Sequence, residues 1–283
     1  MLLAGVLVAV AAAACNAAGS VLQRAASRRH DPTSGWRRGL LALLRRPAWT
    51  AGIAAHFVGF LLQAVALTLT LITVVQPVLV VELPFTLLLG ALLLGAPLGR
   101  RAWLAVAAMA GGVVVFLACL RPQGGGPQSA STAAWLIGTA VVVVVLVVLT
   151  VLGRAGRGRE RALWFGTAAG VTYGFNAALL AGLAPAYADG LSGVLSAWQT
   201  YGVLVGGTVS FLFLQQALQA HDLLWAQPGI TLANPVVAVV WGLTVFGERL
   251  AVDVRLLGLA VGVIAIVVGT VVLSRIEEEV DGG

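Results

Sequence analysis

The sequence predicts an all-α membrane protein, a polytopic bundle of about nine transmembrane helices built from two inverted-topology repeats. Three observations lead to this prediction. The 283 residues are 60% hydrophobic and only 10% charged, with a mean hydropathy of +0.99, which no soluble globular domain matches. Apolar runs of about 20 residues, the length that crosses a ~30 Å hydrocarbon core, recur along the chain. One short polar pattern also occurs in both halves.

Apolar windows give nine candidate spans. The first run continues past Cys15 and has no basic residue before it, so we expect a membrane helix rather than a cleaved signal peptide. Two spans almost fuse at Thr70, and we expect them to be separate because fusion would reverse the side of every later loop. The spans are expected near 2–22, 51–70, 73–94, 102–120, 133–152, 163–184, 198–218, 223–246 and 255–273.

All 17 cationic residues are arginines, and they gather between the spans. When the loops alternate between two faces, fourteen arginines lie on one face and three on the other. The positive-inside rule then places the protein in the inner (cytoplasmic) membrane with the N-terminus outside and the C-terminus in the cytoplasm. Membrane anchoring explains the +6 charge, so no nucleic-acid partner is expected. The larger group is Arg24, Arg28, Arg29, Arg37, Arg38, Arg45, Arg46, Arg100, Arg101, Arg154, Arg157, Arg159, Arg161 and Arg275; the smaller is Arg121, Arg249 and Arg255.

The first basic loop contains an amphipathic segment at 35–46. Trp36, Leu40 and Leu43 fall on one helical face, and arginines stand at both ends. At about 12 residues the segment is too short to cross the membrane, so we expect an interfacial helix that lies on anionic lipid.

A Gln-Pro pair followed by a second proline occurs in both halves. An offset of 151 residues, as between Phe60 and Phe211, brings Gln76-Pro77 onto Gln227-Pro228 and Pro84 onto Pro235. An offset of 160 aligns Asn16 with Asn176. An odd number of crossings separates the equivalent spans, so the second unit is inverted relative to the first. Inverted repeats with interrupted helices near the midplane are typical of secondary transporters. The candidate gating residues are therefore Pro77, Pro84, Pro228 and Pro235.

The repeat also divides the chain into segments. The first four-helix repeat covers 1–120, a Gly-rich flexible external linker covers 121–132, and an almost purely Val and Leu helix at 133–152 is expected to be peripheral. The second four-helix repeat covers 153–273, and a solvated acidic tail covers 274–283.

The second half resembles the drug/metabolite transporter superfamily. Its EamA-like pattern is Pro235 within a span, then Gly247-Glu248-Arg249-Leu250, then Gly258 and Gly262 in the last helix. The layout of nine spans is similar to that of the NIPA-type magnesium transporter branch. The resemblance implies paired repeats and transport of a small solute. The chain departs from that branch at 59–63, where Gly-Phe-Leu-Leu-Gln lacks the acidic residue of Gly-Glu-x-x-Asn, and at 95–98, where Gly-Ala-Pro-Leu replaces Gly-Glu-Arg-Leu.

Glu82 is the only acidic residue flanked on both sides by half a span of apolar residues. A carboxylate in the bilayer centre costs about 2.5–3.5 kcal/mol on insertion scales, so it usually marks a binding site or a proton pathway. The alternative is a permanently protonated Glu82 that bonds to a neighbour such as Gln63 or His56.

Other polar side chains interrupt the spans at helical spacing. They either line a midplane cavity or bond between helices to hold the bundle together. The candidate substrate- or proton-binding residues are Glu82, Gln76, Asn16, Gln63, Asn176, Gln215, Gln219, Gln227, Thr231 and Asn234.

These observations predict a secondary transporter of a small metabolite or drug-like solute, coupled to protons through Glu82. One alternative is a NIPA-like transporter of magnesium or another divalent cation, and another is a non-transporting lipid-binding membrane protein that uses 35–46. The expected partners are the solute, protons and membrane lipids, with a homodimer as an open option. No enzyme motif is present and no cofactor is expected; Cys15 and Cys119 form neither a disulfide framework nor a metal site.

Overall fold

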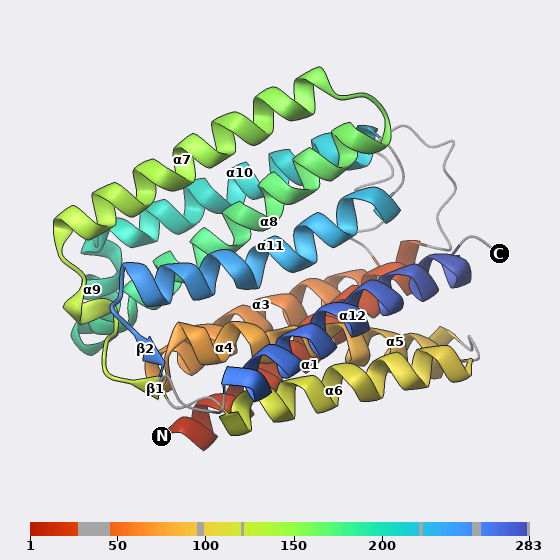
Figure 1. Cartoon of the computed structure of the whole chain (residues 1–283), viewed down its shortest axis with the longest axis horizontal. Helices are drawn as coiled ribbons and strands as arrows, with labels where there is room; N and C mark the ends of the chain where they lie inside the picture. The colour runs from red at the N-terminus through yellow and green to blue at the C-terminus, as the bar shows by residue number, and fades with distance from the viewer. Residues whose placement is uncertain (28–45, 95–98, 120–121, 221–222, 251–255, 282–283) are drawn as a thin grey trace.

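The computed structural model describes residues 1–27, 46–94, 99–119, 122–220, 223–250 and 256–281, which form a bundle of long helices (Figure 1). Its helices are α1 Leu2–Ser27, α3 Pro47–Leu69, α4 Ile72–Leu79, α5 Glu82–Leu94, α6 Arg100–Cys119, α7 Thr132–Ala155, α8 Arg159–Gly182, α9 Gly190–Ser196, α10 Trp198–Ala220, α11 Leu223–Thr244 and α12 Leu256–Asp281. Two 3-10 helices, η1 Pro127–Ser129 and η2 Ala184–Asp189, and two short strands, β1 Pro122–Gln123 and β2 Arg249–Leu250, complete the described elements.

Six helical segments in the described part of the chain are long and apolar enough to cross a membrane. They are α1, α3, the α4–α5 pair, α6, α7 and α10. α8 becomes a seventh when it is taken together with η2 and α9, to which it is bent by 44°. α11 and α12 contain shorter apolar stretches, Gly229–Thr244 and Leu257–Val272. The chain is therefore a multi-pass helical membrane protein.

The long helices run back and forth between two ends of the bundle (Figure 1). Met1 and the β1–β2 pair lie at one end, here called the Met1 end, and the C-terminus lies at the opposite end. Thr70 and Leu71 are extended, so α3 and α4 are distinct helices that meet at the Met1 end. The predicted separation of these two spans is confirmed.

The span around Glu82 is interrupted. α4 ends at Leu79 and α5 begins at Glu82, and the Leu83 N–H donates to the Val80 carbonyl at 3.2 Å across the turn between them. Pro84 stands in the first turn of α5, where a missing backbone donor is tolerated. The predicted break in this span is therefore confirmed.

The equivalent helix in the second half is continuous. α11 runs unbroken through Pro228 and Pro235, so the prediction of a second proline-broken helix is wrong for this structure. α8 packs along α11 at very short range: a Cβ on Gly170 would lie 2.7 Å from the carbonyl oxygens of Gly229 and Ile230. Gly166 and Gly174 approach α11 in the same way, so small residues let the backbones of α8 and α11 pack closely.

α6 and α12 cross where two glycines meet. A Cβ on Gly112 would lie 2.8 Å from the Gly262 carbonyl oxygen, and a Cβ on Gly262 would lie 2.9 Å from the Gly112 carbonyl oxygen. The two helices run antiparallel (Figure 1). Close backbone contact at this point joins the last helix of each half.

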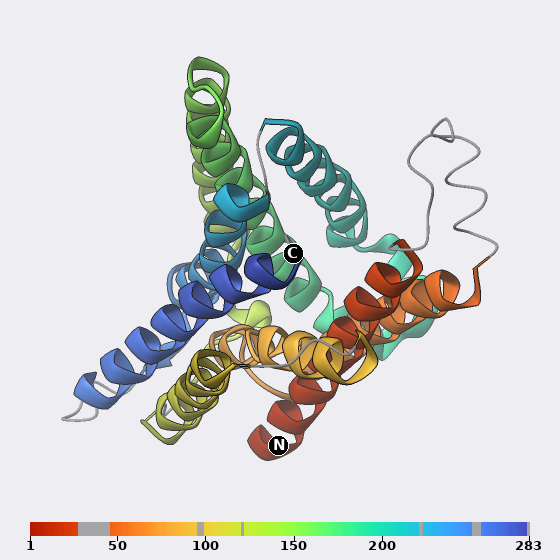
Figure 2. The same ribbon diagram turned by 90° about the vertical axis from the view of Figure 1, so that its right-hand side faces the viewer.

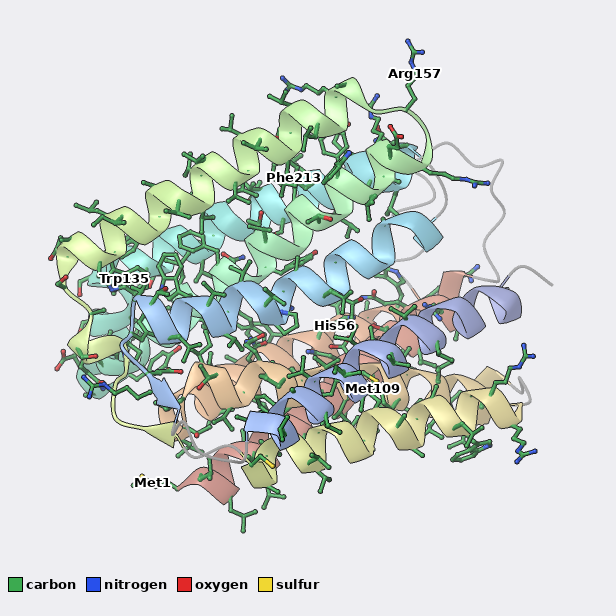
Figure 3. The ribbon with its side chains drawn as sticks, in the orientation of Figure 1. Met1, His56, Met109, Trp135, Arg157 and Phe213 are labelled. Atoms are coloured by element: carbon green, nitrogen blue, oxygen red, sulfur yellow. The ribbon has the colours of Figure 1, made fainter. Side chains whose placement is uncertain are left out.

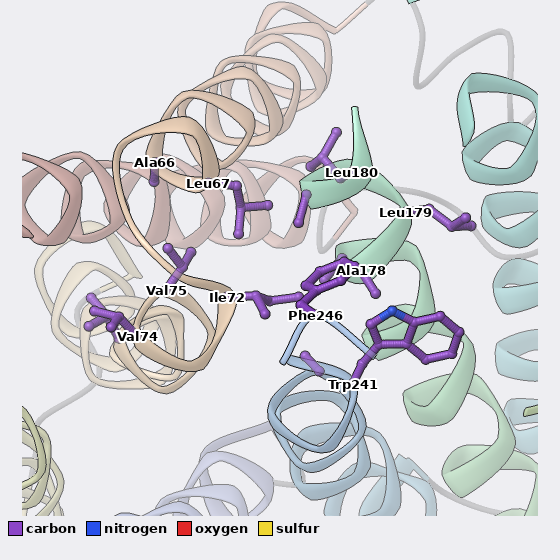
Figure 4. Packing of buried hydrophobic residues seen from close by; sticks show 14 of the residues in the cluster. Ala66, Leu67, Ile72, Val74, Val75, Ala178, Leu179, Leu180, Trp241 and Phe246 are labelled. Atoms are coloured by element: carbon purple, nitrogen blue, oxygen red, sulfur yellow. The ribbon is translucent and has the colours of Figure 1, made fainter. Parts of the chain in front are cut away.

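The core is densest at the Met1 end, between the start of α4 and the end of α11. Ile72 lies against Phe246, and Trp241 packs beside them (Figure 4). Trp135, labelled in Figure 3, adds a further ring, with centroids 5.4 Å from Trp241 and 5.5 Å from Phe246. This aromatic cluster joins α4, α7 and α11.

The Gly-rich stretch predicted as a flexible linker packs against the second half. β1 pairs antiparallel with β2, and the Ser129 hydroxyl donates to the Phe246 carbonyl at 2.8 Å. α12 continues as a helix to Asp281, through most of the predicted acidic tail. The predicted interfacial helix at 35–46 lies outside the described residues except for Arg46.

Candidate functional site

A cavity of about 480 Å³ lies between the two halves of the chain. α1, α3, α4 and α5 supply its walls from the first half, and α8, α10 and α11 supply them from the second. It brings together the predicted site residues Asn16, Gln63, Gln76, Glu82, Asn176, Thr231, Asn234 and Pro235.

Glu82 enters the cavity because the span is interrupted there. It is half-buried in the first turn of α5, and the Thr86 hydroxyl donates to its backbone carbonyl at 2.9 Å. A helix N-terminus favours a negative charge through the helix dipole. The break therefore places a carboxylate at the boundary of the two halves in a position that offsets part of its desolvation cost.

Three amide atoms near the cavity have no hydrogen-bond partner among the described residues. They are Gln76 Nε2, Asn176 Oδ1 and Asn234 Oδ1, each almost fully removed from the surface. The whole Gln76 side chain is only 2% exposed, although it lines the cavity. Buried polar atoms are nearly always paired in folded proteins, so three unpaired ones on residues that line one cavity make it a candidate site for a polar group.

The two cavity asparagines sit in matching surroundings. Asn16 Oδ1 on α1 occupies the space that a Cβ at Gly59 on α3 would take, and Asn176 Oδ1 on α8 does the same at Gly206 on α10. In each half, a glycine on the neighbouring long helix makes room for the amide. The amide alignment noted in the sequence therefore has a counterpart in three dimensions.

Gln215 and Gln219 lie away from this cavity. Only Val203 and Gly207 of α10 reach it, and Gln215 stands eight residues further along, roughly 12 Å at 1.5 Å per residue. Gln219 is exposed on the surface. These two glutamines are therefore not among the described residues that line this cavity, because only the first half of α10 approaches it.

Pro77 and Pro84 are not among the described residues that line the cavity. Pro77 is buried inside α4 and Pro84 lies in the first turn of α5. The side chains of Gln227 and Pro228 lie outside the described part of the structure. His56, proposed as a partner of Glu82, packs on α1, where its ring lies 2.8 Å from the position of a Cβ at Gly19 (Figure 3).

Tyr173 lines the cavity and was not predicted. It stands three residues before Asn176 on α8, so both side chains lie on one face of the helix. This spacing is the signal that could have identified it from the sequence.

Glu248 is a second residue whose role was missed, at the Met1 end of the bundle. Its side chain is 3% exposed, and its two oxygens accept the N–H groups of Ile72 and Thr73 at 3.1 Å each. Burial raises the pKa of this carboxyl, and its hydrogen bonds from Thr73 and Ile72 oppose that shift in part. Gly242 allows the close approach, since a Cβ there would lie 2.6 Å from Glu248 Oε2. Glu248 thus attaches the second half to the first turn of α4.

In the described part of the chain, the residues that line the cavity supply amides, hydroxyls and a single carboxylate, and no arginine is among them. Amide and hydroxyl groups can donate and accept hydrogen bonds, whereas Glu82 favours a cationic or proton-bearing partner. The arrangement is suited to a neutral or positively charged polar group.

Comparison with known proteins gives one relative. No family model and no solved structure matches the chain. An uncharacterized protein of Corynebacterium glutamicum is 30% identical over 279 residues, which cover 96% of this chain and 95% of the relative. The chain therefore belongs to the same protein family as this Corynebacterium glutamicum protein.

Proposed function

We propose that this protein is a secondary transporter and that the cavity binds its solute. The observation that carries the proposal is the meeting of polar side chains from both halves at the interrupted α4–α5 span, with three buried amide atoms left unpaired. Transporters built from inverted repeats bind their substrates at such a boundary, beside a discontinuous helix.

Two features of the packing support an inverted repeat. The Asn16–Gly59 and Asn176–Gly206 contacts join equivalent pairs of helices in the two halves. The antiparallel crossing of α6 and α12 places Gly112 against Gly262, 150 residues further along the chain, close to the offset of the sequence repeat. A local two-fold axis through this crossing accounts for both observations.

The proposed topology has nine spans in the inner membrane, with the Met1 end outside. At the opposite end, Arg100 begins α6, Arg154 lies in the last turn of α7 and Arg157 follows that helix, and Figure 3 shows Arg157 projecting from the bundle there. Lysine- and arginine-rich connections stay in the cytoplasm. The C-terminus is therefore proposed to be cytoplasmic.

Glu82 is proposed to couple transport to protons. Among the described residues it is the only acidic side chain that lines the cavity, and it stands at the turn where the span is interrupted. Loss or gain of its proton changes the charge that the solute meets, which gives each conformation a different affinity for the solute. The proposed solute is a small metabolite or drug-like molecule.

Flux in proteoliposomes with an imposed pH gradient tests this proposal. We expect saturable flux in the wild type and its loss in Glu82→Gln, which keeps the size of the side chain and removes its charge. Glu160→Gln is the matched control, because Glu160 is exposed in the first turn of α8 and lies outside the cavity lining. Unchanged pH-driven flux in Glu82→Gln would contradict the coupling role. Metal uptake that is insensitive to the pH gradient would favour a divalent-cation transporter instead.

A further inference from the structure

An apolar groove of about 650 Å³ lies next to the polar cavity. It runs between α3 and α10 and is closed toward the Met1 end by η2 and α9. Its lining residues on α3 include Ala64 and Val65, and Leu183, Val194 and Leu204 are among those across the groove. Its composition is suited to hydrocarbon rather than to a polar solute.

The groove and the polar cavity are adjacent. Phe60, Leu180 and Val203 line both of them, so the same three side chains form the boundary between the polar and apolar spaces. A single molecule at this boundary meets Glu82 and the amides on one side and only hydrocarbon and a few hydroxyls on the other.

The groove opens toward the surrounding membrane. Val65 on α3 is 47% exposed and Leu204 on α10 is 65% exposed, and both line it. Figure 2 shows α10 standing apart from α3 and α1. A molecule in the bilayer can therefore enter the groove sideways, without crossing the water at either end of the bundle.

The polar side of this combined site selects among head groups. A phosphate there would be buried beside Glu82 with no arginine among the lining residues to pair with it. A hydroxyl or ammonium group, in contrast, would donate to Glu82, and the amide side chains of Asn176 and Asn234 line the same space.

We propose that the substrate is an amphiphile with a hydroxylated or cationic head group, which binds with its head in the polar cavity and its alkyl chain in the α3–α10 groove. This inference rests on the proposed transport function and names the class of its substrate. Entry is lateral, from the membrane leaflet nearest the Met1 end.

Photolabelling in phosphatidylcholine nanodiscs tests the inference. Three probes carry the same dodecyl chain with a diazirine at its end and differ only in the head group, which is ammonium, glucosyl or phosphate. We expect the ammonium and glucosyl probes to label the peptides around Val65 and Leu204. The phosphate probe is expected to label them no more than it labels the lipid-facing surface of α7.

Matched tryptophan variants show whether the groove itself is used. Val65→Trp fills it and is expected to lower labelling at α3 and α10 by at least about fivefold. Val58→Trp is the control, because Val58 is an equally exposed valine of α3 (46%) that does not line the groove. Leu204→Trp repeats the test from α10, with its neighbour Val205→Trp as the control, since Val205 is 64% exposed and does not line the groove.

Each outcome decides the inference. Equal labelling by the probes with the three head groups would mean that ordinary bilayer lipid fills the groove. Equal labelling in Val65→Trp and Val58→Trp would show that the alkyl chain of the probe lies elsewhere. Either result overturns the inference. If no long-chain probe labels the groove while ethylammonium is carried in a Glu82-dependent manner, the transporter proposal survives and the amphiphile proposal fails. If neither binding nor flux is seen, both fail.

Discussion

Glu248 joins the two halves of the bundle through the first turn of α4. A helix begins with N–H groups that lack partners within the helix, and Leu71, the N-cap residue of α4, supplies no side-chain acceptor. Glu248 supplies the acceptors from the far end of the chain, with one oxygen each for Ile72 and Thr73. The position of the interrupted span therefore depends on a side chain more than 170 residues away.

Replacement of Glu248 by alanine is expected to destabilise the protein. Two buried N–H groups of α4 would lose their acceptor, at about 1–3 kcal/mol for an unsatisfied buried donor. The unfolding temperature in detergent measures the effect. Glu160→Ala, at an exposed glutamate of α8, is the control and should leave this temperature nearly unchanged. An equal effect of the two substitutions would contradict the capping role.

The same carboxyl should make stability depend on pH. Glu248 lies beyond the end of α11, and burial raises its pKa above the ordinary value of 4.5, so the folded protein holds this proton more tightly than the unfolded chain does. Its contribution to stability is therefore complete below pH 4.5 and is lost as the pH rises through the folded pKa. The glutamine in Glu248→Gln does not titrate. The unfolding temperature of the wild type minus that of Glu248→Gln should therefore fall as the pH rises. A difference that grows with pH would contradict this assignment.

At the scale of elements, the two proline-containing spans differ in structure, because one is interrupted and the other is continuous. α4 and α5 are separated by a turn that places Glu82 in the cavity. α11 is continuous and is packed along its length against the glycines of α8. We therefore expect α4 and α5 to move during transport while α8 and α11 form the more rigid side of the site.

Pro84→Ala is expected to lower transport without lowering stability. The alanine has a backbone N–H that proline lacks, and this N–H can donate to the carbonyl of Val80, four residues earlier, which now accepts from Leu83. That bond favours a continuous helix and moves Glu82 from the turn. A loss of about tenfold in flux, or ~1.4 kcal/mol in the barrier, is the expected order, with an unfolding temperature equal to or above that of the wild type.

The control for this variant is Pro47→Ala. Pro47 occupies the first turn of α3, where proline interrupts nothing, and it does not line the cavity. Its replacement should leave flux close to that of the wild type. If both alanine variants lose flux equally, the turn between α4 and α5 has no special part in transport.

At the scale of the whole molecule, the sequence predicts those features of the structure that depend on local patterns, namely the helices and the polar residues within the spans. Apolar runs identify the helices, because a helix needs about 20 apolar residues to cross a bilayer and this length does not depend on the rest of the fold. Asn16, Gln76 and Glu82 could be selected because polar groups are costly in a span, and the structure does bring them together.

The rest depends on contacts between distant segments. The continuity of α11 follows from its close packing against α8, and the role of Glu248 follows from its contact with Ile72 and Thr73. Whether Gln215 reaches the cavity is decided by the path of α10, which approaches the cavity at Val203 and Gly207 and has left it eight residues later. Helical spacing alone cannot supply this information.

The proposed nine-span topology places successive connections on alternating sides of the membrane, and reporter fusions can test it. Alkaline phosphatase is active only outside the cytoplasm, and green fluorescent protein fused in the same way fluoresces only inside. Fusions after Gln128 and Asp189, both at the Met1 end, should give phosphatase activity, whereas fusions after Gly156 and Gly283 should fluoresce. If α11 or α12, whose described apolar stretches are short, did not cross, the Gly283 fusion alone would change sides while the first three kept theirs. That result would leave the odd number of crossings between α1 and α8 unchanged, but it would remove one of the four spans proposed for the second repeat.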